Sequence, residues 1–392
     1  MVRTPCFALV AALAACRPAP SVPPTNDRLA TALAALLDSA LAASPGLPGA
    51  MLRVEAPSLG FVWTKAVGAS DRVGANPLRP EQTLRIASNT KTYVAAAILR
   101  LVEDGRLTLD APIAGHIFPA SVAKLKEDGY DAARITVRML LQHTSGLADY
   151  ATVAVGSANM ALYGPFMERI VAEPSHRWTR AEQLALAVEH GAPYGGPGEV
   201  YHYSDTGYIL LGEILETVTG RPMQVAVREL LDFNGRGIRN TYFETLDSVP
   251  TGAPPRAHQY MDSLDTNGFD ASVDLYGGGG LVSNLEDVAR FYRGLVRGEA
   301  FTHRATLDTM LTVSSQSLKE GPGGYGMGIG RSDRGGVECF GHGGFWGTAA
   351  RHCPAIDLTV TVAVTNTSAR AALAEVTQGA IRLAAQAIAA AK

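Results

Sequence analysis

Hydrophobic and polar residues alternate along the first hundred residues with the periods of secondary structure. Residues 27–43 carry apolar side chains at helical spacing and predict an amphipathic helix. Residues 49–56 and 60–67 predict two strands separated by a Pro-Ser-Leu-Gly turn. A buried helix is predicted to follow residue 88 and to end at Gly105, with an inward face formed by Val94, Ala97, Ile98, Leu101 and Val102.

The last part of the chain is predicted to be a sheet closed by a helix. Four strands and a final helix are expected at residues 325–331, 337–343, 348–353, 358–366 and 369–391. The middle of the chain is helical, with a helix at residues 206–219 and another that a capping box opens at Ser283. The pattern indicates an α+β fold that ends in an antiparallel sheet capped by a terminal helix.

The N-terminus has the layout of an export signal. Arg3 precedes an apolar run at residues 7–15 that is too short to span a bilayer and ends in Leu13-Ala14-Ala15-Cys16. The last four residues resemble a bacterial lipobox, so we expect residues 1–15 to be removed and the new N-terminal cysteine to carry lipid. An ordinary cleaved leader with an incidental cysteine is the alternative, and either interpretation exports the protein.

A short tether is expected to follow Cys16. Residues 16–27 are rich in proline and small polar residues, which suits an extended connection between a membrane surface and a folded domain at residues 28–392. Arg17, rather than aspartate, follows the cysteine, which favours the outer membrane, on the periplasmic side, in a host that has one. The expected location is therefore the cell envelope.

Composition excludes several classes of function. The chain of 392 residues is 47% hydrophobic and 18% charged, with a net charge of −3, so no nucleic-acid partner is expected. No His-Glu-x-x-His motif or zinc-spaced Cys-His cluster is present, and no metal or other cofactor is predicted. The absence of a Gly-x-Ser-x-Gly elbow argues against an α/β-hydrolase. The oligomeric state is not predicted.

Two cysteines remain once Cys6 leaves with the leader and Cys16 is taken by lipid. Cys339 and Cys353 flank a probable hairpin centred near Trp346. In an oxidising compartment we predict that they pair across this hairpin, with two free buried thiols as the alternative.

The strongest candidate for chemistry is Ser88-Asn89-Thr90-Lys91, at the junction of a strand-like segment and the buried helix. Residues three apart share one face of a helix, so the Lys91 amine would lie one turn from the Ser88 hydroxyl. A desolvated lysine can take the proton of a serine, which makes the pair a candidate nucleophile and base. A second Ser-x-x-Lys, from Ser121 to Lys124, leads into a charged segment typical of a solvated turn or short surface helix.

Other polar positions have both structural and functional interpretations. Tyr203 stands just before the helix at residues 206–219, where its phenol could enter a cleft or simply pack. His342 lies in a glycine-rich strand, where it could add a donor or a positive charge beside a substrate, unless the glycines form only a tight bulge. His143 is interpreted as a structural histidine at a helix end, because no carboxylate stands at motif spacing to orient it.

Taken in order, Ser88-Asn89-Thr90-Lys91, Tyr203-Ser204-Asp205 and His342-Gly343-Gly344 resemble the three motifs of the penicillin-recognising serine hydrolases. The resemblance is to the branch holding class C β-lactamases, D-alanyl-D-alanine carboxypeptidases, D-aminopeptidases and certain esterases. It implies a β-lactamase/transpeptidase-like fold, in which a sheet is flanked by the N- and C-terminal helices, a helical lobe is inserted, and the active site lies between the two lobes. The sheet lobe would comprise about residues 28–105 and 275–392, and the helical lobe about residues 106–274.

The resemblance also implies roles for individual residues. Ser88 would be the nucleophile, and Lys91 and Tyr203 would share the acid and base work. The oxyanion hole would be formed by the backbone N–H groups of Ser88 and Phe345. The expected substrate-binding residues are Asp205, His342, Gly343, Gly344 and Phe345.

Two departures from the motifs bear on the substrate. Gly343 stands where these enzymes usually carry a hydroxyl that binds the substrate carboxylate. Asp205 stands in place of an asparagine, so it brings negative charge near Lys91, favours a protonated amine and leaves Tyr203 as the better candidate for general base. Both changes favour neutral esters or small D-amino-acid amides and peptides as substrates, handled by a serine hydrolase through an acyl-enzyme. The alternatives are a D-alanyl-D-alanine carboxypeptidase or class C-type β-lactamase, and a non-catalytic penicillin-binding envelope protein.

Overall fold

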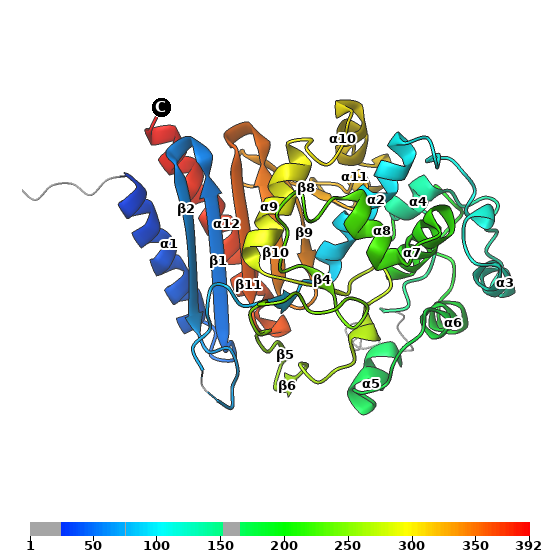
Figure 1. Ribbon diagram of the computed structural model, residues 1–392, viewed down its shortest axis with the longest axis horizontal. Coiled ribbons are helices and arrows are strands. Elements are labelled where there is room, and N and C mark those ends of the chain that lie inside the picture. Colours follow the sequence, from blue (N-terminus) through cyan, green and yellow to red (C-terminus); the bar gives the residue numbers. More distant parts are fainter. Residues whose placement is uncertain (1–24, 75, 152–164) are drawn as a thin grey trace, which may run out of the picture.

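The computed structural model describes residues 25–74, 76–151 and 165–392 (Figure 1). The predicted leader, Cys16 and most of the tether lie outside these residues. The first helix, α1 (Thr25–Ala42), begins inside the expected tether rather than at residue 27. Within the described residues, no helix has both the length and the apolar character needed to cross a bilayer.

A six-stranded antiparallel sheet forms one side of the molecule (Figure 1). Its strand order is β2-β1-β11-β10-β9-β8, so the first hairpin of the chain lies beside the last strand, with Ala50 opposite Val364. Every residue of β11 is buried, as expected for a central strand covered on both faces. The strands are β1 (Gly49–Ala56), β2 (Phe61–Gly68), β8 (Gly330–Asp333), β9 (Glu338–Gly344), β10 (Thr348–Cys353) and β11 (Leu358–Val364).

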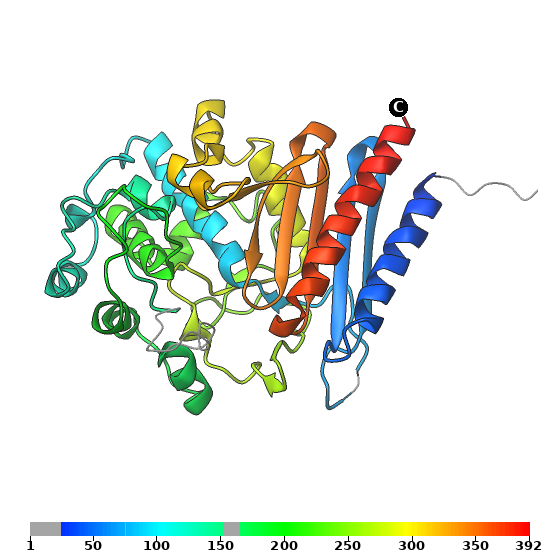
Figure 2. The same cartoon turned by 180° about the vertical axis from the view of Figure 1, so that it is seen from behind.

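Helices cover both faces of this sheet. α1 and α12 (Arg370–Ala390) lie side by side on one face (Figure 2), and α9 (Leu285–Val296) packs against β10 and β11 on the other. The apolar stripe of each terminal helix is buried against the sheet, which explains the helical spacing seen in the sequence. The α+β architecture predicted from the pattern is thereby confirmed. Residues in this core include Leu29, Leu33, Leu37, Leu52, Val54, Val360, Val376 and Ile381.

The remaining helices form a lobe beside the sheet, with α2 (Thr90–Glu103) at its centre (Figure 1). All the side chains from Thr90 to Leu99 are buried, and the helix packs against α7 (Asp205–Thr219) and α8 (Met223–Leu230). Ser88 lies in the turn just before α2, so this turn leads into a helix that its neighbours hold in place. Other helices here are α3 (Pro119–Glu127), α4 (Val137–Leu141), α5 (Pro165–Ala172), α6 (Arg180–His190), α10 (Arg304–Leu311) and α11 (Ser315–Glu320).

Two small sheets connect the lobes. Short strands pair in the order β3-β7-β4, and β5 pairs with β6. Because β3 leads directly to the turn that holds Ser88, the first of these sheets fixes the entry of the chain into that turn. The bounds are β3 (Leu84–Arg85), β4 (Tyr242–Phe243), β5 (Tyr260–Met261), β6 (Leu264–Asp265) and β7 (Leu281–Ser283).

Two local predictions are wrong. The strand expected at residues 325–331 begins only at Gly330, because Gly328 has a φ of 70° and turns the chain before extended pairing can start. The capping box expected to begin at Ser283 is displaced by one position. Asn284 caps α9 by accepting a hydrogen bond from the Asp287 N–H, while Ser283 ends strand β7.

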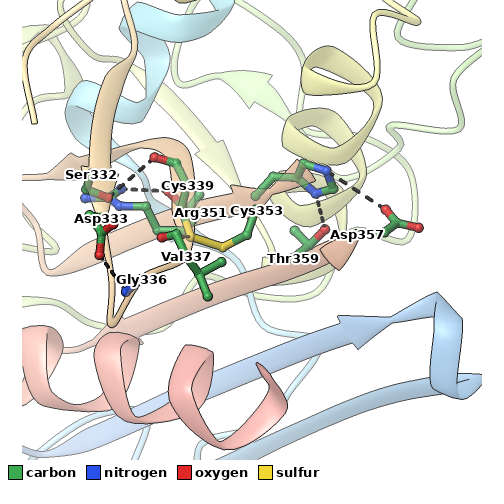
Figure 3. The surroundings of a disulfide bond; sticks show 11 residues. Ser332, Asp333, Gly336, Val337, Cys339, Arg351, Cys353, Asp357 and Thr359 are labelled. Carbon is green, nitrogen blue, oxygen red and sulfur yellow. Dashed lines mark hydrogen bonds and ion pairs between the residues drawn. A yellow bond between two sulfur atoms is a disulfide. The ribbon is translucent and has the colours of Figure 1, made fainter. Parts of the chain in front are cut away.

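A disulfide joins Cys339 to Cys353 across the β9–β10 hairpin (Figure 3). Both half-cystines are fully buried in the core between the sheet and the terminal helices. The bond ties together the two strands that lead into and out of the glycine-rich turn. It restricts the relative movement of those strands next to the candidate site.

Candidate active site

Ser88 lies in a single 3₁₀ turn, Ala87–Asn89, between β3 and α2. Ala87 adopts a φ of 44°, a strained value for a residue with a Cβ atom, so the turn is held by its surroundings. The Asn89 side chain donates to Thr348 Oγ1 at 3.0 Å, and that hydroxyl donates to the Ile86 carbonyl at 3.1 Å. The nucleophile turn is therefore fastened to strand β10.

Lys91 is fully buried and its Nζ is surrounded by acceptors. Nζ lies 2.9 Å from Ser88 Oγ and 2.8 Å from the Gly278 carbonyl oxygen, and it forms an ion pair with Asp205 Oδ1. An ammonium has three N–H donors, and these three oxygen atoms account for all of them. The arrangement fits a protonated amine in the resting site.

Tyr203 lies against both members of the pair. Its ring centroid is 5.0 Å from Lys91 Nζ, and Tyr203 lines the same cavity as Ser88. Burial raises the pKa of Tyr203 well above its usual value, and the Asp205 charge raises it further, while the Ser88 side chain acts in the opposite direction. The structure thus brings Ser88, Lys91 and Tyr203 together.

The segment from residues 143 to 149 holds Tyr203 in place. The Ser204 N–H donates to His143 Nδ1 at 3.1 Å, and the Asp205 N–H donates to Asp149 Oδ1 at 3.1 Å. The His143 ring is buried and its centroid lies 4.2 Å from that of Tyr203. His143 is occupied as an acceptor and serves as a packing residue, which is the structural role expected from the sequence.

Carboxylates gather beside the ion pair, and the sequence reasoning had singled out only Asp205. Burial, together with the Asp205 charge, raises the pKa of Asp149 to about 7. Burial also raises the pKa of Asp274 to about 6. All three line the cavity next to Ser88, so Asp149 and Asp274 place negative charge there only at pH values above their raised pKa values.

The glycine run at residues 277–280 is a second feature that the sequence reasoning missed. Gly278 supplies the carbonyl that accepts from Lys91, and a Cβ atom on it would lie 2.6 Å from Asp205 Oδ1. A Cβ on Gly279 would lie 2.3 Å from Asp274 Oδ2. Only glycine leaves room for the chain to pass this close to the carboxylates, and four consecutive glycines were the available signal.

His342 does not take the place expected for it. Its Nδ1 donates to the Gly343 carbonyl at 2.6 Å, and its Nε2 accepts from the Tyr325 hydroxyl at 2.9 Å. Burial, reinforced by the Lys91 charge, lowers the pKa of His342 to about 3, so the ring is neutral. His342 is not among the described residues that line the cavity, and the expectation of a positive charge beside the substrate is wrong.

The next three positions of the strand do face the cavity: Gly343, Gly344 and Phe345 all line it. A Cβ atom on Gly344 would lie 2.3 Å from the Ile86 carbonyl oxygen, so this glycine allows β9 to lie against the nucleophile turn. A Cβ on Gly343 would meet only the Thr348 carbonyl oxygen, at 3.8 Å, which leaves space for a side chain.

The cavity itself has a volume of about 480 Å³, within the range of small-molecule sites. Ser88 and Tyr203 both line it, and most of the wall is apolar. Elsewhere, the second Ser-x-x-Lys forms no site, since the buried Ser121 hydroxyl donates to Glu213 at 2.8 Å and Lys124 pairs with Glu127. Among the described residues, no group of three or more histidine, cysteine or acidic side chains is placed to hold a metal ion.

A family model described as Beta-lactamase matches residues 37–386. The chain belongs to the beta-lactamase family. The resemblance of the three motifs is confirmed by this match over nearly the whole folded domain. Fold similarity agrees: the structure superimposes on a D-stereospecific amidohydrolase from Streptomyces sp. with a TM-score of 0.73 and 27% identity, covering 89% of this chain and 98% of that one.

Two of the curated relatives are named as an esterase and a D-aminopeptidase. The chain is 27% identical over 271 residues to esterase EstB of Burkholderia gladioli, covering 63% of this chain and 66% of that protein. It is 24% identical over 311 residues to a D-aminopeptidase of Cereibacter sphaeroides, covering 79% of this chain and 55% of that protein. The match therefore spans about half to two thirds of the length of these curated relatives.

Proposed function

We propose that this beta-lactamase family member is a serine hydrolase that acts on esters and small D-amino-acid amides or peptides through an acyl-enzyme. The observation that carries the proposal is the 2.9 Å contact between Lys91 Nζ and Ser88 Oγ, beside a cavity that both Ser88 and Tyr203 line. The names of relatives, esterase and D-aminopeptidase, support the substrate classes.

The reaction takes two steps. With Tyr203 in its phenolate form, Ser88 Oγ attacks the substrate carbonyl carbon and gives its proton to the phenolate oxygen, while the oxyanion forms near the backbone N–H groups of Ser88 and Phe345. The bond to the leaving alcohol or amine then breaks, and Tyr203 returns the proton to that group. Water repeats the sequence on the Ser88 ester and releases the acid.

Asp205 sets the pH range of this chemistry. Because its charge raises the pKa of Tyr203, the basic form of the phenol is scarce at neutral pH, and activity should increase toward alkaline pH. Asp205→Asn removes the charge and should move the rising limb of the pH profile of kcat/KM to lower pH by about one unit, the effect of a single nearby charge. A series of rates from pH 5 to 10 measures this, and an unmoved limb would mean that the limb reports another group.

The residues that line the cavity indicate which substrate charges it accepts. Gly343 offers no hydroxyl for a substrate carboxylate, and the ionised forms of Asp149 and Asp274, which predominate above their raised pKa values, disfavour an anion nearby. These features favour neutral esters and amides that carry an amine as substrates. Carboxypeptidase substrates and β-lactams both carry a carboxylate and are expected to be turned over more slowly.

Gly343→Thr tests this assignment directly, because the structure leaves space for the side chain. The added hydroxyl should raise kcat/KM for carboxylate-bearing substrates about ten- to a hundredfold, the value of a hydrogen bond to a charged group. Gly343→Ala is the matched control, since it adds the Cβ atom without the hydroxyl. Equal rates for the threonine and alanine variants would show that position 343 does not face the carboxylate.

A substrate panel separates the three candidate functions. Short p-nitrophenyl esters and D-amino-acid amides should be turned over faster than a D-Ala-D-Ala peptide or a chromogenic cephalosporin. Faster cephalosporin turnover would favour a β-lactamase instead. No turnover of any of the four, together with no adduct from a fluorescent penicillin or a fluorophosphonate, would favour a non-catalytic penicillin-binding protein.

We further propose that the protein is exported and anchored in the cell envelope by lipid on Cys16, which lies outside the described residues. The lipobox-like Leu13-Ala14-Ala15-Cys16 and the proline-rich residues that follow support this proposal. Cys16→Ala should move the protein from the membrane fraction to the soluble fraction of lysed cells. An unchanged distribution would contradict lipid anchoring at this cysteine.

A further inference from the structure

The apolar part of the wall of the catalytic cavity is built from several elements that meet in one apolar cluster. Helix α5 directs Phe166, Met167 and Ile170 into it, and the β9–β10 turn contributes Phe345 and Trp346. These positions on α5 share one face at helical spacing, while the neighbouring Val171 is 46% exposed. The cavity therefore has an apolar wall to which one face of α5 contributes three side chains.

This wall is continuous with the nucleophile turn. Ala87, which immediately precedes Ser88, belongs to the same cluster of apolar residues, and Phe345 directly follows the Gly343–Gly344 strand end. The acyl group of the substrate stays bonded to Ser88 through its carbonyl carbon in the acyl-enzyme. Its substituent must therefore lie in the space next to both the Ser88 turn and the end of β9. The leaving group has a different requirement, because it must receive a proton from Tyr203 and then depart.

Resting on the proposed function, we propose that this wall is the acyl-group subsite and that Met167 and Ile170 set its size. The enzyme then selects acyl groups that carry a bulky apolar substituent, such as a benzyl or a C6 chain, over acetyl. A cavity of about 480 Å³ has room for such a group, whereas an acetyl group would leave most of the wall in contact with water. Ile170 is the better position to alter, since it is 2% exposed.

The test uses a series of p-nitrophenyl esters with a constant leaving group: acetate, butyrate, hexanoate and phenylacetate, each corrected for its uncatalysed rate. Native enzyme should show a phenylacetate-to-acetate ratio of kcat/KM of at least about ten, since each apolar group that fills a pocket contributes about that much selectivity. Ile170→Trp fills the subsite and should lower this ratio at least about tenfold. Val171→Trp places the same side chain on the exposed side of α5 and should leave the ratio unchanged.

Further variants and substrates keep the result interpretable. Ile170→Ala enlarges the subsite and should move the optimum to longer chains, which covers the case in which Ile170→Trp fails to fold. Equal ratios in native, Ile170→Trp and Ile170→Ala proteins would overturn the proposal, as would a change confined to a second series in which the alcohol varies and the acyl group is constant. Absence of all ester turnover and of fluorophosphonate labelling would instead refute the serine hydrolase function itself.

Discussion

Ser88→Ala is expected to reduce kcat/KM for every accepted substrate by at least about 10⁴-fold, because acyl transfer loses the only oxygen that could form the covalent intermediate. Whatever turnover remains would come from binding and from the oxyanion donors. The same substitution should abolish the adduct that a fluorophosphonate or a penicillin forms with the native protein, as read by intact-protein mass spectrometry.

The chain supplies a matched control for this experiment. Ser121 also precedes a lysine by three positions, but its hydroxyl is bound to the buried Glu213 and Lys124 pairs with Glu127. Ser121→Ala should keep the probe adduct at native yield, although loss of a hydrogen bond to a buried carboxylate should lower the free energy of unfolding by about 1–3 kcal/mol. An adduct of undiminished yield on Ser88→Ala protein would show that another nucleophile reacts.

Much of the fold could be predicted from the sequence because its signals are local. The buried faces of α1 and α12 repeat at helical spacing, and the strands that meet at β11 are separated by turn residues that break extended structure. The three motifs were also readable, since each contains its chemical groups within a few residues. The motifs are more than a hundred residues apart in the sequence, and only their resemblance to a known family predicted that they lie together in one site.

Features that depend on contacts between distant segments could not be predicted. The hydrogen bonding of His342 depends on the Tyr325 hydroxyl. Tyr325 lies in a turn at a position where a strand was expected. Asp274 and Gly278 enter the site only because the loop before β7 passes beside α7. The type and spacing of a residue do not reveal which distant side chain will form hydrogen bonds with its polar atoms. Those hydrogen bonds decide whether the residue faces the substrate.

The same contacts explain why Asp205 is compatible with the site. A carboxylate this close to a buried lysine forms an ion pair, and the Asp205 backbone N–H is fixed by Asp149. The ion pair with Asp205 and the hydrogen bond to the Gly278 carbonyl engage the Lys91 amine, so another group is the better candidate for the base. Tyr203 lines the cavity beside Ser88, which makes its phenol the decisive test of the mechanism.

Tyr203→Phe is expected to lower kcat by about 10²–10⁴-fold, the usual contribution of a positioned acid and base. The phenylalanine ring keeps the packing against His143 and Lys91, so the change removes the hydroxyl alone. The rise in activity toward alkaline pH should disappear with it, since the phenol is the group whose pKa burial and Asp205 raise. Steady-state rates from pH 5 to 10 and the rate of fluorophosphonate labelling measure both effects.

Tyr201→Phe is the matched control, because Tyr201 lies two positions away and burial raises the pKa of its phenol to about 12. This variant should retain the native pH profile and labelling rate within about twofold, as expected for a change outside the reacting groups. If Tyr203→Phe instead kept more than a tenth of native activity with the alkaline rise intact, the phenol would not be the base. Lys91 would then have to lose its proton despite Asp205, and Asp205→Asn would be the variant that makes this easier.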